Sequence, residues 1–303
     1  MTQRHIPTRA ELQSYVREHR NWGRWGSKGA AGTVNLITAE KRVASARLVR
    51  SGRTVSLSRP WPVKPTAENP DPASLYVMSD GTPSDGGAID YLGVAYHGHS
   101  VTHVDSLAHV WDQDGLWEGH DPWETIAPSG VKHGSVDAWK DGIVTRGVML
   151  DVPKHRGEKY VTLDKPVHGY ELEEIADREG LTVEAGDALV VYSGREAFAA
   201  EHGGTWGGHA EMPGLHPSCL PFMREHDVSV LVWDMLDLMP LVYGNVNLHT
   251  AINAFGVVLL DNALLEPLAA ACAEEKRYEF LLTVSPLVVP GGTGSPVNPI
   301  ALF

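Results

Sequence analysis

Histidines and an aspartate that could do chemistry are clustered between residues 97 and 109. The chain has 15 histidines in 303 residues, and four of them fall in this short run. Histidines scattered over the surface would not cluster so tightly. His99 and His103 are four residues apart, and Asp105 follows two residues later. Two imidazoles and one carboxylate suit Zn²⁺, Mn²⁺ or Fe²⁺ and leave positions for water and substrate. The spacing predicts a divalent metal site at these three residues.

The three side chains can share an ion only if the chain bends between them. In a straight strand His99 and Asp105 would be about 20 Å apart. A regular helix that brings the two histidines together points Asp105 elsewhere. We therefore expect a turn or bulge over 99–103, which Gly98 would permit, and extended structure over 103–105.

Other residues near this motif are candidates for proton transfer and substrate contact. His109 lies just beyond it, and imidazole titrates near neutrality, as a general acid or base must. Trp111 and Trp117 follow closely and could form the wall for a flat substrate. His216 could line the same pocket or cap a helix.

The glycine-rich segment 21–35 contains Trp22 and Trp25, which could cover the site or a neighbouring subunit. An isolated monomer would expose these large apolar groups. We therefore predict a homo-oligomer.

Periodicity and turn residues predict the elements that must position these groups. Several of the expected strands are apolar on both faces, as buried strands are. We read one α/β domain over 1–303 with a mixed sheet and helices outside it, in which 1–52 is a helical arm and loop. The expected helices are 10–20, 38–52, 168–180, 195–203, 217–227 and 263–275, and the expected strands are 53–60, 74–79, 147–152, 187–193, 228–235, 256–261 and 278–284.

The motif resembles that of the cyclase/kynurenine formamidase-like metal hydrolases, which include arylformamidases and isatin hydrolases. Their signature is His-x-Gly-Thr-His-x-Asp-x-Pro-x-His, and here the run is His99-Ser-Val-Thr-His-Val-Asp-Ser-Leu-Ala-His109. The ligand positions, the threonine and the last histidine match. Val101 and Leu107 replace the glycine and the proline, which are shape positions rather than ligands.

The resemblance continues along the chain. Family members have a later His followed twelve residues on by Glu and then Asn; here His249 is followed by Asp261 and Asn262. The resemblance implies that His249 and Asp261 complete the first site or hold a second ion, so that one or two Zn or Mn ions bind per chain. It also implies a swivelling β/α/β fold with a mixed, partly barrel-like sheet, and dimers or tetramers.

The leading hypothesis is hydrolysis of an amide, such as an aryl formamide or an isatin-like lactam, or of a lactone. Hydroxide held by the metal would attack the carbonyl, and His109 would move the proton. One rival is a lyase or cyclase in which the metal polarises a carbonyl without attack by water. Another is a protein that binds metal or ligand without catalysis.

Charge and composition restrict the partners. The net charge of -13 disfavours nucleic acid and anionic membranes, so a small-molecule substrate is expected. Two cysteines make no disulfide framework, and the polar N-terminal stretch lacks the apolar core of a secretory signal. We expect a cytoplasmic enzyme.

Overall fold

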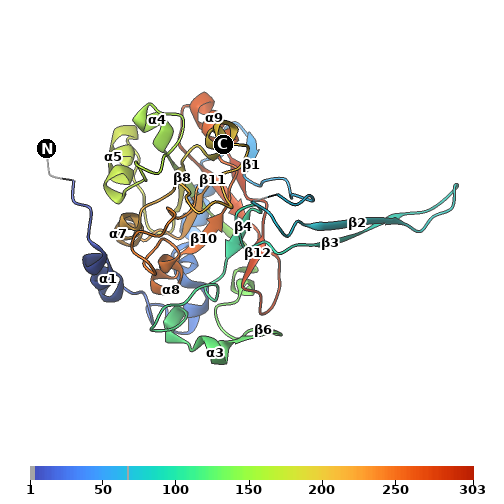
Figure 1. Ribbon diagram of the computed structural model, residues 1–303, viewed down its shortest axis with the longest axis horizontal. Coiled ribbons are helices and arrows are strands. Elements are labelled where there is room, and N and C mark those ends of the chain that lie inside the picture. The colour runs from blue at the N-terminus through green and yellow to red at the C-terminus, as the bar shows by residue number, and fades with distance from the viewer. Residues whose placement is uncertain (1–3, 67) are drawn as a thin grey trace.

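A curled mixed sheet forms the centre of the computed structural model, which describes residues 4–66 and 68–303 (Figure 1). Strands β7 to β10 pair in parallel, and the other neighbouring pairs are antiparallel. The nine strands, in sheet order, are β1 (Thr54–Ser56), β13 (Ile300–Leu302), β11 (Glu279–Val284), β7 (Ile143–Asp151), β8 (Ala188–Tyr192), β9 (Val230–Trp233), β10 (Val258–Asp261), β4 (His103–Asp105) and β12 (Gly294–Pro296).

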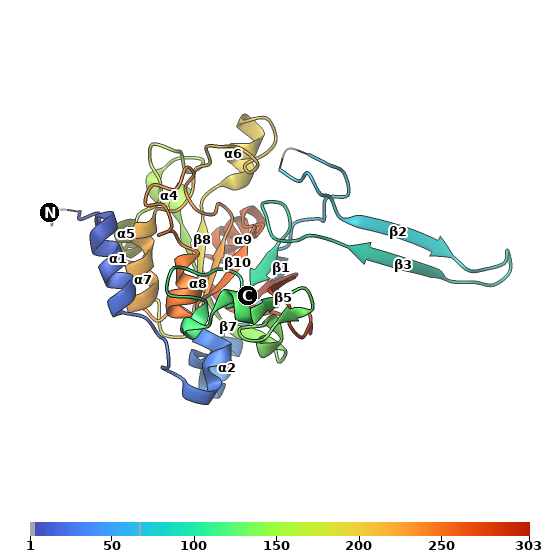
Figure 2. The same ribbon diagram turned by 60° about the horizontal axis from the view of Figure 1, so that its bottom comes forward.

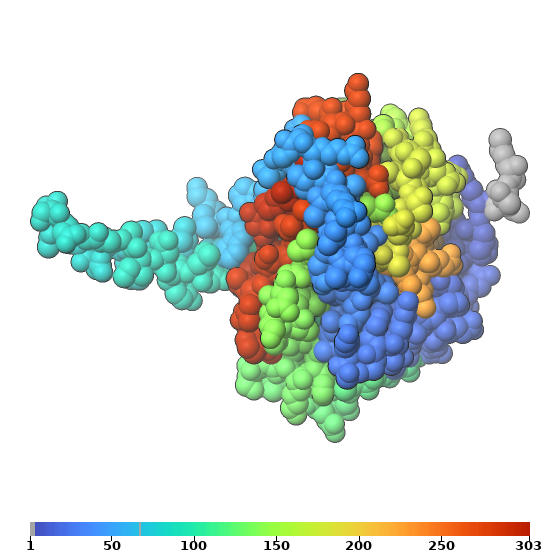
Figure 3. Space-filling model, turned by 180° about the vertical axis from the view of Figure 1, so that it is seen from behind, coloured from blue at the N-terminus to red at the C-terminus, as the bar shows by residue number. Residues whose placement is uncertain are grey.

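The middle strands β8, β9 and β10 are buried along their whole length, because helices cover a parallel sheet on both faces. Helix α2 packs against β7 and β11, and α5 packs against α7 and β7. Figure 2 shows α1, α5 and α7 side by side, and Figure 3 shows the molecule from behind relative to Figure 1. The α-helices are α1 (Arg9–Glu18), α2 (Ala39–Ala46), α3 (Pro122–Thr125), α4 (Val152–Arg156), α5 (Gly169–Glu179), α6 (Arg195–Glu201), α7 (Leu220–Glu225), α8 (Thr250–Phe255) and α9 (Glu266–Glu275).

The predicted fold class is confirmed: the protein is mixed α/β, with a partly barrel-like sheet and surrounding helices. Element ends differ from the expectation. The helix expected over 38–52 ends at Ala46, and the one expected over 217–227 begins with a 3₁₀ turn, η4 (Pro217–Cys219). Further 3₁₀ segments are η1 (Gly26–Leu36), η2 (Trp117–Gly119) and η3 (Val136–Trp139). None of the helices described in the structure is both long and apolar enough to cross a membrane.

The strand expected over 74–79 is present, but it lies outside the central sheet. It is β2 (Ser74–Ser79), which among the described residues pairs only with β3 (Ala88–Gly93), in a hairpin that projects from the body (Figure 1). We call this hairpin, residues 74–93, the arm. Its side chains are mostly exposed, although the sequence pattern is that of a buried strand. A separate small hairpin joins β5 (Ile126–Ala127) to β6 (Gly130–Val131).

The positions of the two tryptophans in the glycine-rich segment do not support the argument from which a homo-oligomer was predicted. Trp22 and Trp25 are partly buried against the core of their own chain. The indole N–H of Trp22 donates to the carbonyl of Asn253 at 2.5 Å, and the ring of Trp25 lies 6.1 Å from that of Trp117. Residues 1–3 of the predicted N-terminal arm lie outside the described residues.

A buried ion cluster fixes the start of β8. The carboxylate of Asp187 is fully buried and accepts hydrogen bonds from the guanidinium of Arg146 at 2.5 and 3.0 Å. It also lies 2.6 Å from the ammonium of Lys41 and accepts from the backbone N–H of Glu184 at 2.8 Å. This carboxylate therefore joins α2, β7 and β8, and its role is structural.

Asp187→Ala should destabilise the protein by about 3–5 kcal/mol, because it removes the fully buried carboxylate that Arg146 and Lys41 share and leaves Arg146 only the more exposed Glu184 and Glu279. Chemical denaturation at equilibrium measures the loss. The control is Lys159→Ala, which removes an exposed ion pair with Glu201 and should change the unfolding free energy little. Equal loss in both variants would contradict the role of the cluster.

Candidate metal centre

Strands β4 and β10 bring together the two halves of the predicted site, which are far apart in sequence. Their antiparallel register places His103 opposite Asp261, and Asp105 opposite Leu259. His103, Asp105 and Asp261 are all buried. His249 precedes α8, and its Nε2 lies 3.4 Å from Asp261 Oδ2.

The expected bend before β4 is present. Gly98 has φ of 140°, a value that favours glycine, and the chain becomes extended from His103 to Asp105. The side-chain amide of Asn262 holds the bend by donating to the carbonyls of Gly98 and Val101 at 2.7 and 3.1 Å. The site is thus shaped by residues at the end of β10.

The guanidinium of Arg195, at the start of α6, fixes the same bend from the other side. It is buried and donates to the His99 carbonyl, to Glu68 and, at 2.8 Å, to the Asn262 side-chain oxygen. The guanidinium therefore has a structural role, because its hydrogen bonds hold backbone and side chains around the motif.

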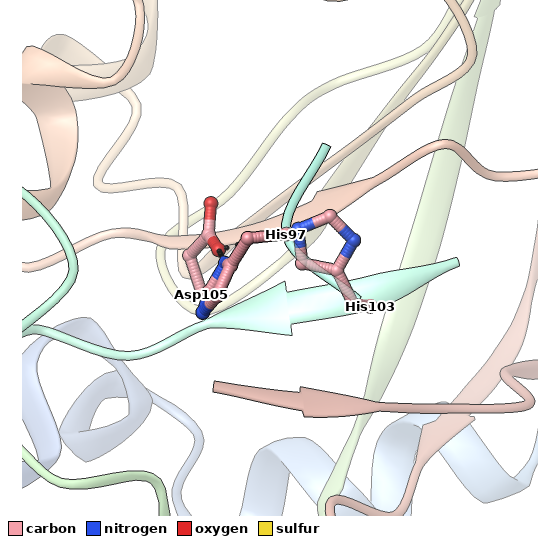
Figure 4. Close-up of side chains that lie close together, drawn as sticks. All are labelled: His97, His103 and Asp105. Atoms are coloured by element: carbon pink, nitrogen blue, oxygen red, sulfur yellow. Dashed lines mark ion pairs between the residues drawn. The ribbon is translucent and has the colours of Figure 1, made fainter. Parts of the chain in front are cut away.

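The carboxylate of Asp105 lies among several imidazoles, and Figure 4 shows it with two of them, those of His97 and His103. Its Oδ1 lies 2.9 Å from His97 Nδ1, 3.4 Å from His103 Nε2 and 3.7 Å from His109 Nε2, and its Oδ2 lies 3.7 Å from His249 Nε2. Neither oxygen has a well-directed hydrogen-bond partner among the described residues. A buried, unpartnered carboxylate among imidazoles fits a divalent cation.

Two histidines are held in the orientation that a ligand needs. His103 Nδ1 is 2.8 Å from the Val101 carbonyl, so it carries the proton and Nε2 has the free lone pair. His249 Nδ1 is 2.5 Å from Asp237 Oδ2, which directs Nε2 towards Asp105 and Asp261. Carboxylate and carbonyl partners of this kind typically orient metal-binding histidines.

The charges of the cluster shift its pKa values strongly. Burial opposes ionisation of Asp105, but the neighbouring imidazoles, His103 foremost, outweigh it and hold the pKa of the carboxyl well below its usual value. Burial likewise disfavours a charged His249, yet Asp237 and Asp261 raise its pKa well above the usual value. For His109, burial prevails and lowers the pKa to about 4, so this imidazole is neutral at pH 7.

The structure brings most, but not all, of the predicted ligands together. His103, Asp105, His249 and Asp261 converge, and two sets have ligand atoms close enough to share an ion: His97, His103 and Asp105, and Asp105, His109 and His249. Within the described residues His99 belongs to neither set. Burial lowers its pKa, and the charges of Asp261 and His249 also act on it, so it lies within electrostatic range of the cluster. As a ligand, His99 stays a prediction.

A cavity of about 320 Å³ opens beside the cluster. Its lining includes His97, His99, Glu68 and Asn69. A volume of this size holds a small organic molecule. Because His97 both lines the cavity and contacts Asp105, a bound molecule would lie next to the candidate metal position.

The predicted substrate contacts are not among the residues that line this cavity. Trp117 is buried, and its indole N–H donates to the Gly29 carbonyl at 2.9 Å, whereas Trp111 is half exposed. His216 is buried, and its Nδ1 accepts from the Ser218 N–H at 3.1 Å, which is the helix-capping alternative. With Trp22 and Trp25 packed on their own chain, all five remain predictions as substrate contacts.

Sequence reasoning did not select His97 or Asp237 as site residues. His97 was visible in the histidine cluster, but the family motif begins at His99. Asp237 follows the buried strand β9, and a carboxylate beyond the carboxyl end of a parallel strand is a recognisable signal. Its pairing with His249 needs the tertiary structure.

Comparison with known proteins agrees with this geometry. The Cyclase family model matches residues 54–238, which is more than half of the chain. A crystal structure described as a novel cyclase is similar, with 27% identity and a TM-score of 0.79, over 94% of this chain and 99% of that one. No match was found among curated proteins.

Two more distant structures share the fold. An isatin hydrolase bound to the product analogue thioisatinate has 15% identity and a TM-score of 0.56, over 88% of this chain and 99% of that one. A predicted metal-dependent hydrolase from Bacillus stearothermophilus has 13% identity and a TM-score of 0.51, over 83% and 98%. With the family match across the motif, these findings establish that the chain belongs to the cyclase family.

Proposed function

We propose that this protein is a metal-dependent hydrolase that cleaves an amide, a lactam or a lactone. The observation that carries the proposal is the Asp105 carboxylate, buried with both oxygens unpartnered among imidazoles and next to a substrate-sized cavity. The related isatin hydrolase structure, bound to its product analogue, supports a small cyclic amide as substrate class.

The proposed ligands are His103, Asp105, His249 and Asp261. A divalent cation there would supply a Lewis acid that polarises a carbonyl and lowers the pKa of water, and Zn or Mn suits these donors. His97 and His99 are the candidates for a remaining position. The two oxygens of Asp105 face different histidines, so this carboxylate could bridge two ions.

His109 is proposed as the general acid and base. Its pKa of about 4 leaves the imidazole neutral at pH 7, with a lone pair that can take a proton from water. The ring stacks on that of His97 at 4.2 Å between centroids, which fixes its plane. Protonated His109 can then deliver the proton to the leaving nitrogen, which an amide requires because an amide anion leaves poorly.

Asp105→Asn should remove bound metal, because an amide oxygen cannot supply the charge that balances the cation. Elemental analysis of the purified variant against wild type measures metal per chain. Asp85→Asn, which changes an exposed carboxylate in the arm, should keep the wild-type content. Full occupancy in Asp105→Asn would refute the site.

Parallel His97→Ala and His99→Ala variants identify the remaining ligand. We expect one of them to lose metal and the other to keep it, since each histidine lies at the cavity but only one can complete a given coordination position.

His109→Ala should keep its metal and lose about 10²-fold or more in turnover, as expected for a lost general acid or base. A panel of amides, lactams and lactones with elemental analysis on the same sample measures both. Wild-type turnover would overturn this role, and loss of metal would make His109 a ligand, which its distance to Asp105 also allows.

The second candidate is a lyase or cyclase that uses the same residues without attack by water. The match to the Cyclase family and to a structure described as a novel cyclase favours it. Reaction in ¹⁸O-labelled water separates the two: a hydrolase puts the label into its product, and a lyase or cyclase does not.

A further inference from the structure

A second cavity, of about 370 Å³, lies between α1, α5 and α7, the three helices that Figure 2 shows side by side. A volume of this size is within the range of sites that bind small molecules. The cavity shares no lining residue with the one at the metal centre, and none of the proposed metal ligands lines it. It is therefore a separate site, with its own chemistry.

The buried part of the lining is apolar and aromatic. Leu12 of α1 is fully buried, and Phe222 of α7 is 3% exposed. Tyr15, one turn along α1 from Leu12, is half-buried and packs against the core. An apolar group that enters the cavity would replace water against these side chains, which favours binding.

The more exposed edge of the cavity carries three carboxylates, those of Glu11, Glu173 and Glu225. The Tyr15 hydroxyl donates to Glu225 Oε1 at 3.2 Å, and Glu173 Oε1 lies 3.1 Å from His226 Nε2. In the part of the chain that the structure describes, Oε2 of Glu225 and Oε2 of Glu173 take part in no hydrogen bond or ion pair. Both oxygens can therefore accept hydrogen bonds from a ligand.

Positive charge at this edge is scarce. No lysine or arginine occurs among the described residues that line the cavity, and His5, 3.7 Å from Glu11, is the one basic side chain among them. The guanidinium of Arg4 is close by, but both carboxylate oxygens of Glu174 bind it, each at 2.9 Å. The field of the three carboxylates attracts cations and repels anions.

The arrangement suits an organic cation better than a metal ion. Within the described residues, no three groups at this cavity have ligand atoms close enough to share a metal ion. An ammonium group has three donors and can reach carboxylates that do not converge on one point. The aromatic rings beside them also attract a cation.

We propose that the cavity between α1, α5 and α7 is a second ligand site, which binds a small primary amine that carries an aromatic group. The ammonium group donates to the free oxygens of Glu173 and Glu225, and the ring packs on Leu12 and Phe222. Charge complementarity selects the amine, and the apolar lining selects its ring. The site is independent of the reaction at the metal centre.

Isothermal titration of the full chain with compounds of one shape and different charge tests the proposal. We expect 2-phenylethylamine to bind once per chain with a Kd below about 1 mM. The neutral 2-phenylethanol and the anionic 3-phenylpropanoate should bind at least about 10-fold more weakly, because they lack the cation. Ethylamine should also bind at least about 10-fold more weakly, because it lacks the ring.

The double variant Glu173→Gln/Glu225→Gln locates the binding. It removes two charges with little change of shape and should weaken binding of 2-phenylethylamine by about 10-fold or more. The matched control is Glu266→Gln/Glu274→Gln, which removes two exposed carboxylates of α9 and should bind the amine as wild type does. If thermal unfolding shows that the first variant is not folded, Glu11→Gln replaces it, since glutamine can keep the capping box of α1.

Three results would overturn the proposal. The first is the absence of saturable amine binding, or equally tight binding of the alcohol or the carboxylate. The second is wild-type affinity in the Glu173/Glu225 variant, or equal weakening in the α9 control, which would reduce the effect to net charge. The third concerns Asp105→Asn, which should bind 2-phenylethylamine as wild type does; lost binding there would place the amine at the metal centre. Because these titrations measure binding alone, their outcome does not depend on which reaction the protein performs.

Discussion

Asp105 carries its charge at the fully buried junction of β10, β4 and β12, where no described residue makes a well-directed hydrogen bond to it. A buried carboxylate is strongly unfavourable unless positive charge or hydrogen bonds offset the lost hydration. The imidazoles of His103 and His249, whose pKa values are raised and which lie within 4 Å, supply that offset in the protein alone, and a cation can replace their protons. The fold must therefore hold these histidines in place before any metal arrives.

That requirement explains the polar network around the site. Asp237 fixes one ring of the cluster, and the Val101 carbonyl fixes another. Arg195 and Asn262 hold the bend that lets neighbouring histidines turn inward. The hydrogen bonds of each of these groups orient a side chain or the backbone of the site, so the cluster is positioned by rigid elements and not by loop contacts alone.

Local pattern predicted the central strands and the bend before β4, and the family resemblance implied that the motif meets the later His249 and Asp261. Local pattern could not predict which apolar strands are covered by other elements and which stay exposed. Strand 74–79 is apolar on both faces like β8 and β9, yet it lies in an exposed hairpin, because coverage depends on tertiary contacts. The sequence also could not decide whether His97 or His99 is the remaining ligand, since both are adjacent to Gly98. The Asp237–His249 contact joins separate elements and has no local signal.

The short strand β4 also constrains the order in which the protein can be assembled. Its two neighbours, β10 and β12, both come from the last fifty residues of the chain, while β4 itself ends at Asp105. During synthesis the histidine motif leaves the ribosome long before either neighbour, and contacts of such high sequence separation form late. The strand that carries the motif therefore stays unpaired until the C-terminal strands have been synthesised. A chain truncated before β12 would keep the whole motif but lack one of the two strands that pair with β4.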